Sequence, residues 1–169
     1  MILRRLGNKK KLAHHIQQYF PPHKLYIEPF FGAGGMFFNK PKAKHNIVND
    51  QDGEVFNLFM VVKNNPDALI DAWMTMPLHH DLWKWWKEHP EQDPVWRSVR
   101  FLFYSNYGFM GMPQTMLFNH GNSKQIVMDG IRRTQEFLCY VEFMNCDFRQ
   151  MFKMLSLSDE KEVLIYCDP

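Results

Sequence analysis

Two acidic residues and a glycine-rich turn have the types and spacing that indicate chemistry. A short apolar stretch at 25–27 runs into Glu28 and then into Gly32 and Gly34, and Asp50 closes the next apolar stretch. Glycines between a strand and a helix let the backbone turn sharply, let a ligand approach without a Cβ, and precede free helical N–H groups. An acid after the second strand can accept hydrogen bonds from both hydroxyls of a ribose. The spacing predicts a site for an adenosine-containing ligand.

Tight packing is the alternative explanation of a single Gly-x-Gly turn. Phe37 stands where a dinucleotide-binding fingerprint needs its third glycine, and no Lys-Ser or Lys-Thr pair follows the turn as it does in a P-loop. The sequence therefore disfavours both NAD-binding and P-loop proteins.

The elements that must position these residues alternate at both ends of the chain. Apolar spacing predicts helices over 10–20, 54–63 and 148–155, one more after the glycine turn, and strands over 25–27, 46–49, 140–144 and 163–167. Strands that alternate with helices are typical of a parallel sheet covered by helices. This pattern predicts an α/β fold.

The middle of the chain has a different pattern. Helical spacing recurs over 68–76, 81–87, 94–104 and 127–138 without a convincing strand, and 105–124 is a loop rich in Gly, Asn, Met and aromatic residues. We predict an α/β domain formed by residues 1–63 and 139–169, with a helical insertion at 64–138. The five tryptophans are expected mainly in the cores of these helices rather than at a base-stacking surface.

The formal net charge of +2 conceals an asymmetry. Residues 1–44 carry nine Lys or Arg and one acidic residue, whereas residues 45–169 carry eleven basic and seventeen acidic residues. A basic block produces a local positive field, for which a phosphate backbone is a common partner. A solvated helix face explains the charge equally well.

Other classes of protein are disfavoured. There is no apolar run of about 18 residues and no apolar stretch behind the basic start, so we expect neither a membrane span nor a signal peptide, and a cytoplasmic location. The three cysteines lack CxxC spacing and are expected to be reduced and buried, and the paired histidines are adjacent in sequence. No metal site is predicted.

Several ordered motifs together resemble the Dam-type (D12 class) DNA adenine N6-methyltransferases. These motifs are Gly7-Asn8-Lys9-Lys10-Lys11-Leu12, Glu28-Pro29-Phe30-Phe31-Gly32-Ala33-Gly34, Asp50, Asn145-Cys146-Asp147-Phe148 and Tyr166-Cys167-Asp168-Pro169. The resemblance covers the whole chain, and the insertion coincides with that family's target-recognition domain. It implies a Rossmann-like, S-adenosylmethionine-dependent methyltransferase sheet in the order 3-2-1-4.

The resemblance also implies roles for residues around the sheet. The cofactor S-adenosylmethionine would be bound by Gly7, Asn8, Lys9, Glu28, Pro29, Phe30, Gly32, Gly34, Asp50, Asp147 and Phe148. Asp168 and the carbonyl of Pro169 would be catalytic, because together they can accept hydrogen bonds from both hydrogens of a flipped-out adenine amine and orient its nitrogen.

Double-stranded DNA is the partner that the resemblance implies. Its contacts would come from Arg4, Arg5, Lys10, Lys11, Tyr107, Met110, Gln114 and Asn119. Family members that read GATC carry Asn and Arg at the positions of Met110 and Gln114, so GATC is not implied as the target.

The sequence ends after the first two residues of the family's Asp-Pro-Pro-Tyr motif and after the fourth strand. We therefore expect no detectable methyl transfer by this chain alone, and a second polypeptide that completes the sheet is one explanation. The alternatives are a non-catalytic DNA-binding remnant, a subunit of a split methyltransferase, and a ribosomal-RNA adenine N6-methyltransferase.

Overall fold

The computed structural model of the chain describes residues 2–5, 7–117, 123–157 and 162–169. Its sheet contains four parallel strands in the order β3-β2-β1-β4. The strands are β1 (Leu25–Glu28), β2 (His45–Asn49), β3 (Val141–Met144) and β4 (Val163–Ile165). The predicted strands, their order and the α/β class are confirmed. Leu25 is level with both His45 and Val163, so the carboxyl ends of β1, β2 and β4 meet at one edge.

Helices cover both faces of this sheet. On one face, Leu25 and Ile27 pack against Met151 of α7 (Phe148–Met154). On the other face, Tyr26 and Val48 join the main core, to which α1 (Ala13–Gln17) and α2 (Gly53–Asn64) also contribute. Alternate residues of a strand point to opposite faces, which explains why β1 is buried along its whole length.

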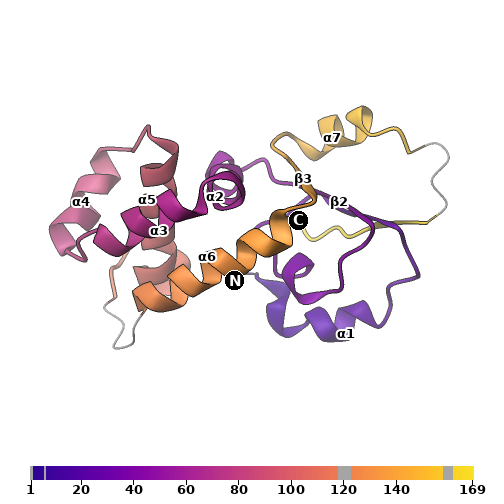
Figure 1. Cartoon of the computed structure of the whole chain (residues 1–169), viewed down its shortest axis with the longest axis horizontal. Helices are drawn as coiled ribbons and strands as arrows, with labels where there is room; N and C mark the ends of the chain where they lie inside the picture. The colour runs from indigo at the N-terminus through magenta and orange to yellow at the C-terminus, as the bar shows by residue number, and fades with distance from the viewer. Residues whose placement is uncertain (1, 6, 118–122, 158–161) are drawn as a thin grey trace.

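The helices of the insertion lie toward one end of the molecule and the sheet lies toward the other (Figure 1). They are α3 (Pro66–Thr75), α4 (His80–Glu88), α5 (Pro94–Tyr107) and α6 (Ser123–Leu138). The first turn of α5 is stabilised by Pro94 and by Asp93, which accepts hydrogen bonds from two backbone amides. Helix α2 packs against α3, α5 and α6, and one apolar core extends from the sheet into the insertion. The insertion therefore shares an apolar core with the sheet and is not connected to it by the backbone alone.

Two helix predictions were wrong in detail. The glycine turn leads into a short 3-10 helix, Phe37–Asn39, and not into an α-helix. Lys40 precedes Pro41 and has an extended backbone, as expected because proline disfavours the α conformation in the residue before it. The helix predicted over 10–20 is a 3-10 turn at Lys9–Lys11 followed by α1. Positive charge at a helix N-terminus is unfavourable, which is consistent with this late start.

The expected burial of the cysteines was also wrong. Cys139 and Cys167 are exposed and Cys146 is half-buried. Cys139 follows the end of α6, and Cys167, which lies within the predicted strand 163–167, comes after β4 has ended at Ile165. Trp73, Trp83 and Trp86 are buried as expected, whereas the Trp85 and Trp96 side chains are exposed. None of the helices in the described part of the chain is long and apolar enough to cross a membrane.

Candidate functional site

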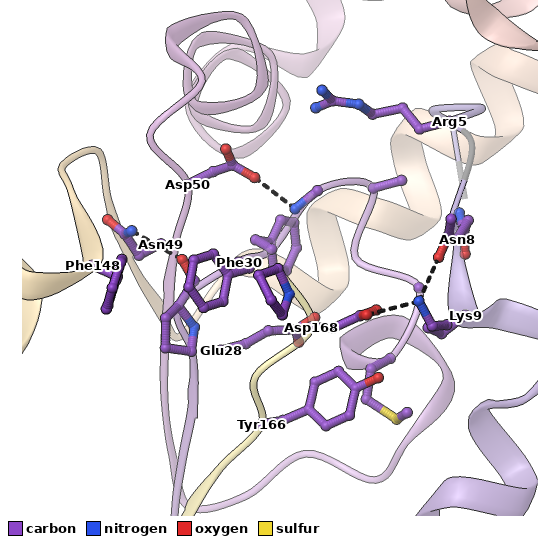
Figure 2. A pocket seen from close by; sticks show the side chains of 18 of the residues that line it. Arg5, Asn8, Lys9, Glu28, Phe30, Asn49, Asp50, Phe148, Tyr166 and Asp168 are labelled. Carbon is purple, nitrogen blue, oxygen red and sulfur yellow. Dashed lines mark hydrogen bonds and ion pairs between the residues drawn. The ribbon is translucent and has the colours of Figure 1, made fainter.

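A cavity of about 300 Å³ lies where β1, β2 and β4 end (Figure 2). The chain leaves β1 toward β2 on one side, and β4 lies on its other side, so the cavity occupies the point where the strand order reverses. Ligands of open α/β sheets bind outside the carboxyl ends of the strands at such a point. Glu28, Asp50 and Asp168 line the cavity from the ends of three different strands.

Most of the predicted cofactor-binding and catalytic residues line this cavity. They are Gly7, Asn8, Lys9, Glu28, Pro29, Phe30, Gly32, Asp50, Phe148, Asp168 and Pro169. Gly34 and Asp147 are not among its lining residues. The motifs that are scattered along the sequence therefore converge on one site.

Asp50 ties the glycine turn to β2. Its Oδ2 accepts a hydrogen bond from the amide of Gly32 at 2.7 Å, and its Oδ1 accepts one from the amide of Asp52 at 2.9 Å. Each carboxylate oxygen can accept a second hydrogen bond. Asp50 can therefore hold the turn in place and still bind a ligand hydroxyl.

The glycines of the turn have different functions. Gly32 has a φ of +55°, and a Cβ built on it would meet no atom within 4 Å, so this glycine leaves open space at the cavity. Gly34 has a φ of +69°, and a Cβ there would collide with the rings of Phe38 and Phe31. Gly34 is needed for packing against the core and does not line the cavity, so its approach to a ligand stays a prediction.

Two aromatic rings stand at one end of the cavity. The ring centroids of Phe30 and Phe148 are 5.3 Å apart with the planes inclined at 49°. The preceding residue, Asp147, caps α7 by accepting a hydrogen bond from the amide of Arg149 at 2.9 Å. Phe148 thus enters the cavity from the start of α7, while the Asp147 carboxylate is used at the helix cap.

Asn49 is a structural residue of the site that sequence reasoning missed. Its side chain is buried, and its Nδ2 donates to the carbonyls of Pro29 at 3.0 Å and Cys146 at 2.9 Å. Its Oδ1 accepts from the amide of Cys146 at 3.1 Å. Asn49 therefore joins the turn after β1 to the turn after β3. A polar residue at the end of a buried strand, which needs such partners, was the available signal.

The side chains of Asp168 and Lys9 both line the cavity and contact each other directly (Figure 2). The Nζ of Lys9 lies 2.7 Å from Oδ1 of Asp168 and also donates to the carbonyl of Gly7 at 3.1 Å. Burial and the nearby Asp168 raise the pKa of Tyr166 to about 12, so this phenol stays protonated. The N-terminal motif and the Asp-Pro motif thus form one polar cluster.

Glu28 lies at the base of the cavity in a buried polar cluster. Its Oε2 accepts a hydrogen bond from the hydroxyl of Tyr26 at 2.7 Å, and the Nζ of buried Lys40 lies 3.9 Å from the centroid of the Tyr26 ring. Burial raises the pKa of Glu28 to about 8, although the Tyr26 hydrogen bond and the charge of Lys40 oppose the shift. Burial also lowers the pKa of Lys40 to about 8. Burial therefore favours the neutral form of Glu28.

A second cavity, of about 450 Å³, adjoins the first and shares Arg5 and Asn8 with it. Four predicted DNA-binding cations, Arg4, Arg5, Lys10 and Lys11, line it together with Met110, and the described lining residues include no Asp or Glu. The predicted basic residues therefore gather beside the first cavity.

The remaining predicted DNA contacts differ in their placement. Gln114 is exposed, and the Met110 side chain is 56% exposed on the turn after α5. Tyr107 is only 1% exposed, and its ring stacks on Trp73 while its hydroxyl bonds to Ser123. This burial in the insertion core argues against a direct contact with DNA. Asn119 lies outside the described residues.

Within the described part of the chain, no three His, Cys, Asp or Glu side chains group closely enough to hold a metal ion. The chemical groups that the site offers are carboxylates, amines, amides and aromatic rings.

Comparison with known proteins gives one family. The family model of the D12 class N6 adenine-specific DNA methyltransferases matches residues 6–169. A DNA adenine methylase of Haemophilus influenzae is 29% identical over 96% of this chain and 60% of its own length. The DNA adenine methylases of Salmonella typhimurium and Escherichia coli K12 are 30% and 28% identical over 63% of this chain and 40% of their own lengths. The chain thus spans about 40–60% of these relatives. It belongs to the D12 class N6 adenine-specific DNA methyltransferases.

Proposed function

We propose that this chain forms the S-adenosylmethionine site and supplies catalytic groups for transfer of a methyl group to the N6 amine of adenine in duplex DNA. The observation that carries the proposal is the convergence of Asp50 and Asp168 on one cavity, from the ends of β2 and β4. The relatives' name, DNA adenine methylase, supports the same reaction.

The residues of the first cavity fit S-adenosylmethionine. The volume of this cavity is at the lower end of the range for small-molecule sites, about 300–1,000 Å³. Asp50 would accept hydrogen bonds from the ribose, and the rings of Phe30 and Phe148 would contact the adenine. The bound cofactor supplies an electrophilic methyl group on a sulfonium.

The methionine end would lie toward Asn8, Lys9 and Glu28. Glu28 is 2% exposed, and a nearby positive charge favours ionisation of such a carboxyl. An approaching α-ammonium group would therefore promote loss of the Glu28 proton and gain a counter-ion. The open space at Gly32 would leave the turn free to contact the ligand.

Asp168 and Pro169 would orient the target amine. The lone pair of an adenine amine is delocalised into the ring, which makes the nitrogen a poor nucleophile. Hydrogen bonds from both amine hydrogens to the Asp168 carboxylate and the Pro169 carbonyl would favour a tetrahedral nitrogen aimed at the methyl group. The target base must leave the duplex to reach this cavity.

Duplex DNA would approach along the second cavity. Arg4, Lys10 and Lys11 are exposed cations there, and phosphate contacts of this kind fix the position of the duplex. Met110 and Gln114 are exposed on the neighbouring loop, where they can reach base edges. This arrangement separates positioning contacts from contacts that read sequence.

The test is transfer of tritium from labelled S-adenosylmethionine to unmethylated duplex DNA, by this chain and by any longer polypeptide that contains it. Mass spectrometry of the nucleosides should identify N6-methyladenine. Transfer should be lost in Asp168→Ala and retained in Asp71→Ala, which changes an exposed acid of α3. Transfer that survives Asp168→Ala would contradict the proposed active site, and transfer to RNA alone would contradict DNA as the substrate.

A further inference from the structure

The N-terminal segment Ile2–Arg5 is bonded to the end of α5 in the insertion. The hydroxyl of Ser105 accepts a hydrogen bond from the amide of Arg4 at 2.7 Å and donates one to the carbonyl of the same residue at 2.9 Å. Ser105 is 2% exposed, so water does not compete freely for these bonds. One side chain therefore fixes both backbone polar groups of Arg4.

Neighbouring contacts hold the same segment. Asn106 donates from Nδ2 to the carbonyl of Ile2 at 3.1 Å, and Ile2 is buried in the main core. Gly111 has a φ of +78°, and a Cβ there would collide with the carbonyl of Arg4. The 3-10 turn Phe109–Gly111, which follows α5, thus lies directly on the backbone of Arg4.

The residues that follow reach the first cavity. Arg5 forms an ion pair with Asp52 at 3.2 Å, and the amide of Asp52 donates to Asp50, the predicted ribose ligand. Asn8 lies against Gly35 of the glycine turn so closely that a Cβ on Gly35 would collide with its Oδ1. The short N-terminal stretch is therefore held at one end by the insertion and at the other end by residues beside the first cavity.

Both cavities share lining residues from this stretch, Arg5 and Asn8. A ligand in either cavity would restrict the motion of the shared backbone. A second ligand would then lose less conformational entropy on binding, which makes the two binding events favour each other. Coupling of this kind is reciprocal between the two ligands.

We propose that Ser105 is a positioning residue that couples binding of an adenosyl ligand in the first cavity to binding of DNA at the second cavity. It acts by holding the Arg4 backbone against α5. When a ligand in the first cavity restricts Asn8 and Arg5, this connection would also restrict the cations that line the second cavity. This inference rests on the proposed function, since it needs both ligands to bind.

The experiment measures the dissociation constant of S-adenosylhomocysteine by calorimetry, with and without saturating unmethylated duplex DNA. In the unaltered chain, DNA should lower this constant at least about fivefold, the lower end of typical coupling between sites. Ser105→Ala should bring the ratio to within about twofold of one. The matched control is Ser98→Ala on the same helix, because Ser98 is also buried and both accepts and donates, but its partners are Asn57 and Pro94. This control should keep the ratio.

A second measurement needs no variant. Amide hydrogen exchange of residues 2–5 in the unaltered chain should slow when S-adenosylhomocysteine is added, although these residues are bonded to the insertion. Unchanged exchange there, or coupling that persists in Ser105→Ala, overturns the assignment. Binding of both ligands with a ratio of one in the unaltered chain overturns the coupling and leaves the proposed function intact. A folded chain that binds neither ligand overturns the proposed function and this inference with it.

Discussion

The Nζ of Lys9 lies 2.7 Å from the carboxylate of Asp168, and this ion pair joins residues that are 159 positions apart in sequence. The same amine donates to the carbonyl of Gly7. The N-terminal motif is thereby connected to the carboxylate that we propose for the target amine. The orientation of Asp168 depends on a residue from the opposite end of the sequence.

A double-mutant cycle of Lys9→Met and Asp168→Asn should give a coupling of about 0.5–1 kcal/mol in the free energy of unfolding. The two side chains are 32% and 28% exposed, so solvent weakens the pair and the value stays in the range of surface ion pairs. Urea unfolding of the four proteins at one pH measures the coupling. Strictly additive effects would show that the pair contributes nothing to the fold.

The buried carboxyl of Glu28 should make stability depend on pH. Its pKa is raised to about 8 in the folded chain, from 4.5 in its ordinary state. Between these values the folded chain keeps a proton that the unfolded chain has lost, so the free energy of unfolding should fall as pH rises from about 5 to about 8. The lowered pKa of Lys40 acts in the opposite direction, but only above pH 8.

The variant that tests this dependence is Glu28→Gln, which removes the titrating group at nearly constant volume. Its unfolding free energy should have a shallower slope over pH 5–8 than that of the unaltered chain. Glu142→Gln on β3 changes an exposed glutamate and should keep the original slope. Equal slopes in all three proteins would exclude Glu28 as the source.

DNA affinity should fall steeply with salt, because the exposed cations of the second cavity replace counter-ions of the phosphate backbone. Replacing Lys10 and Lys11 by Ala should reduce the slope of log affinity against log salt by about one unit for each phosphate contact that is lost. Lys84 and Lys87 are exposed on α4, and their replacement by Ala is the matched control. An unchanged slope in the Lys10 and Lys11 variant would place the DNA elsewhere.

The preference of the chain for particular DNA sequences should depend on Met110 and Gln114 rather than on the lysines of the second cavity. Gln114→Arg and Met110→Asn should change the ratio of affinities between duplexes that differ at one base pair, by about 1–3 kcal/mol for a good bidentate contact. Lys10→Ala should weaken all duplexes by similar factors, since phosphates carry no sequence information. Binding to a randomised duplex library, followed by sequencing, measures both effects. Preferences that are identical in all variants would remove the loop from base recognition.

The sheet and most of its site were predictable from sequence. The apolar stretches 25–27 and 163–167 have the length and composition of buried strands, and parallel strands bring their carboxyl ends to one edge. Asp50 directly follows the predicted strand 46–49, whereas the place of Asp168 in the site came from the resemblance between motifs. The resemblance between motifs supplied the strand order that local patterns do not specify.

Features that depend on tertiary packing were not predictable in this way. Gly34 looks like a ligand-facing glycine in sequence, yet the rings of Phe31 and Phe38 also leave no room for a Cβ at this position. Tyr107 lies in a loop-like stretch, but α5 extends through it and buries its ring against Trp73. The bonds between Ser105 and Arg4 join positions 101 residues apart, which no local spacing could reveal.

The central claim is that the first cavity binds an adenosyl ligand through Asp50, and calorimetry with S-adenosylhomocysteine tests it most directly. The unaltered chain should bind one equivalent. Asp50→Ala should weaken binding by about 1–3 kcal/mol, the cost of removing a charged hydrogen-bond partner. Asp71→Ala should bind as the unaltered chain does, and circular dichroism should show that all three proteins are folded. Absence of binding by the folded, unaltered chain, or equal affinity in Asp50→Ala, would contradict the claim.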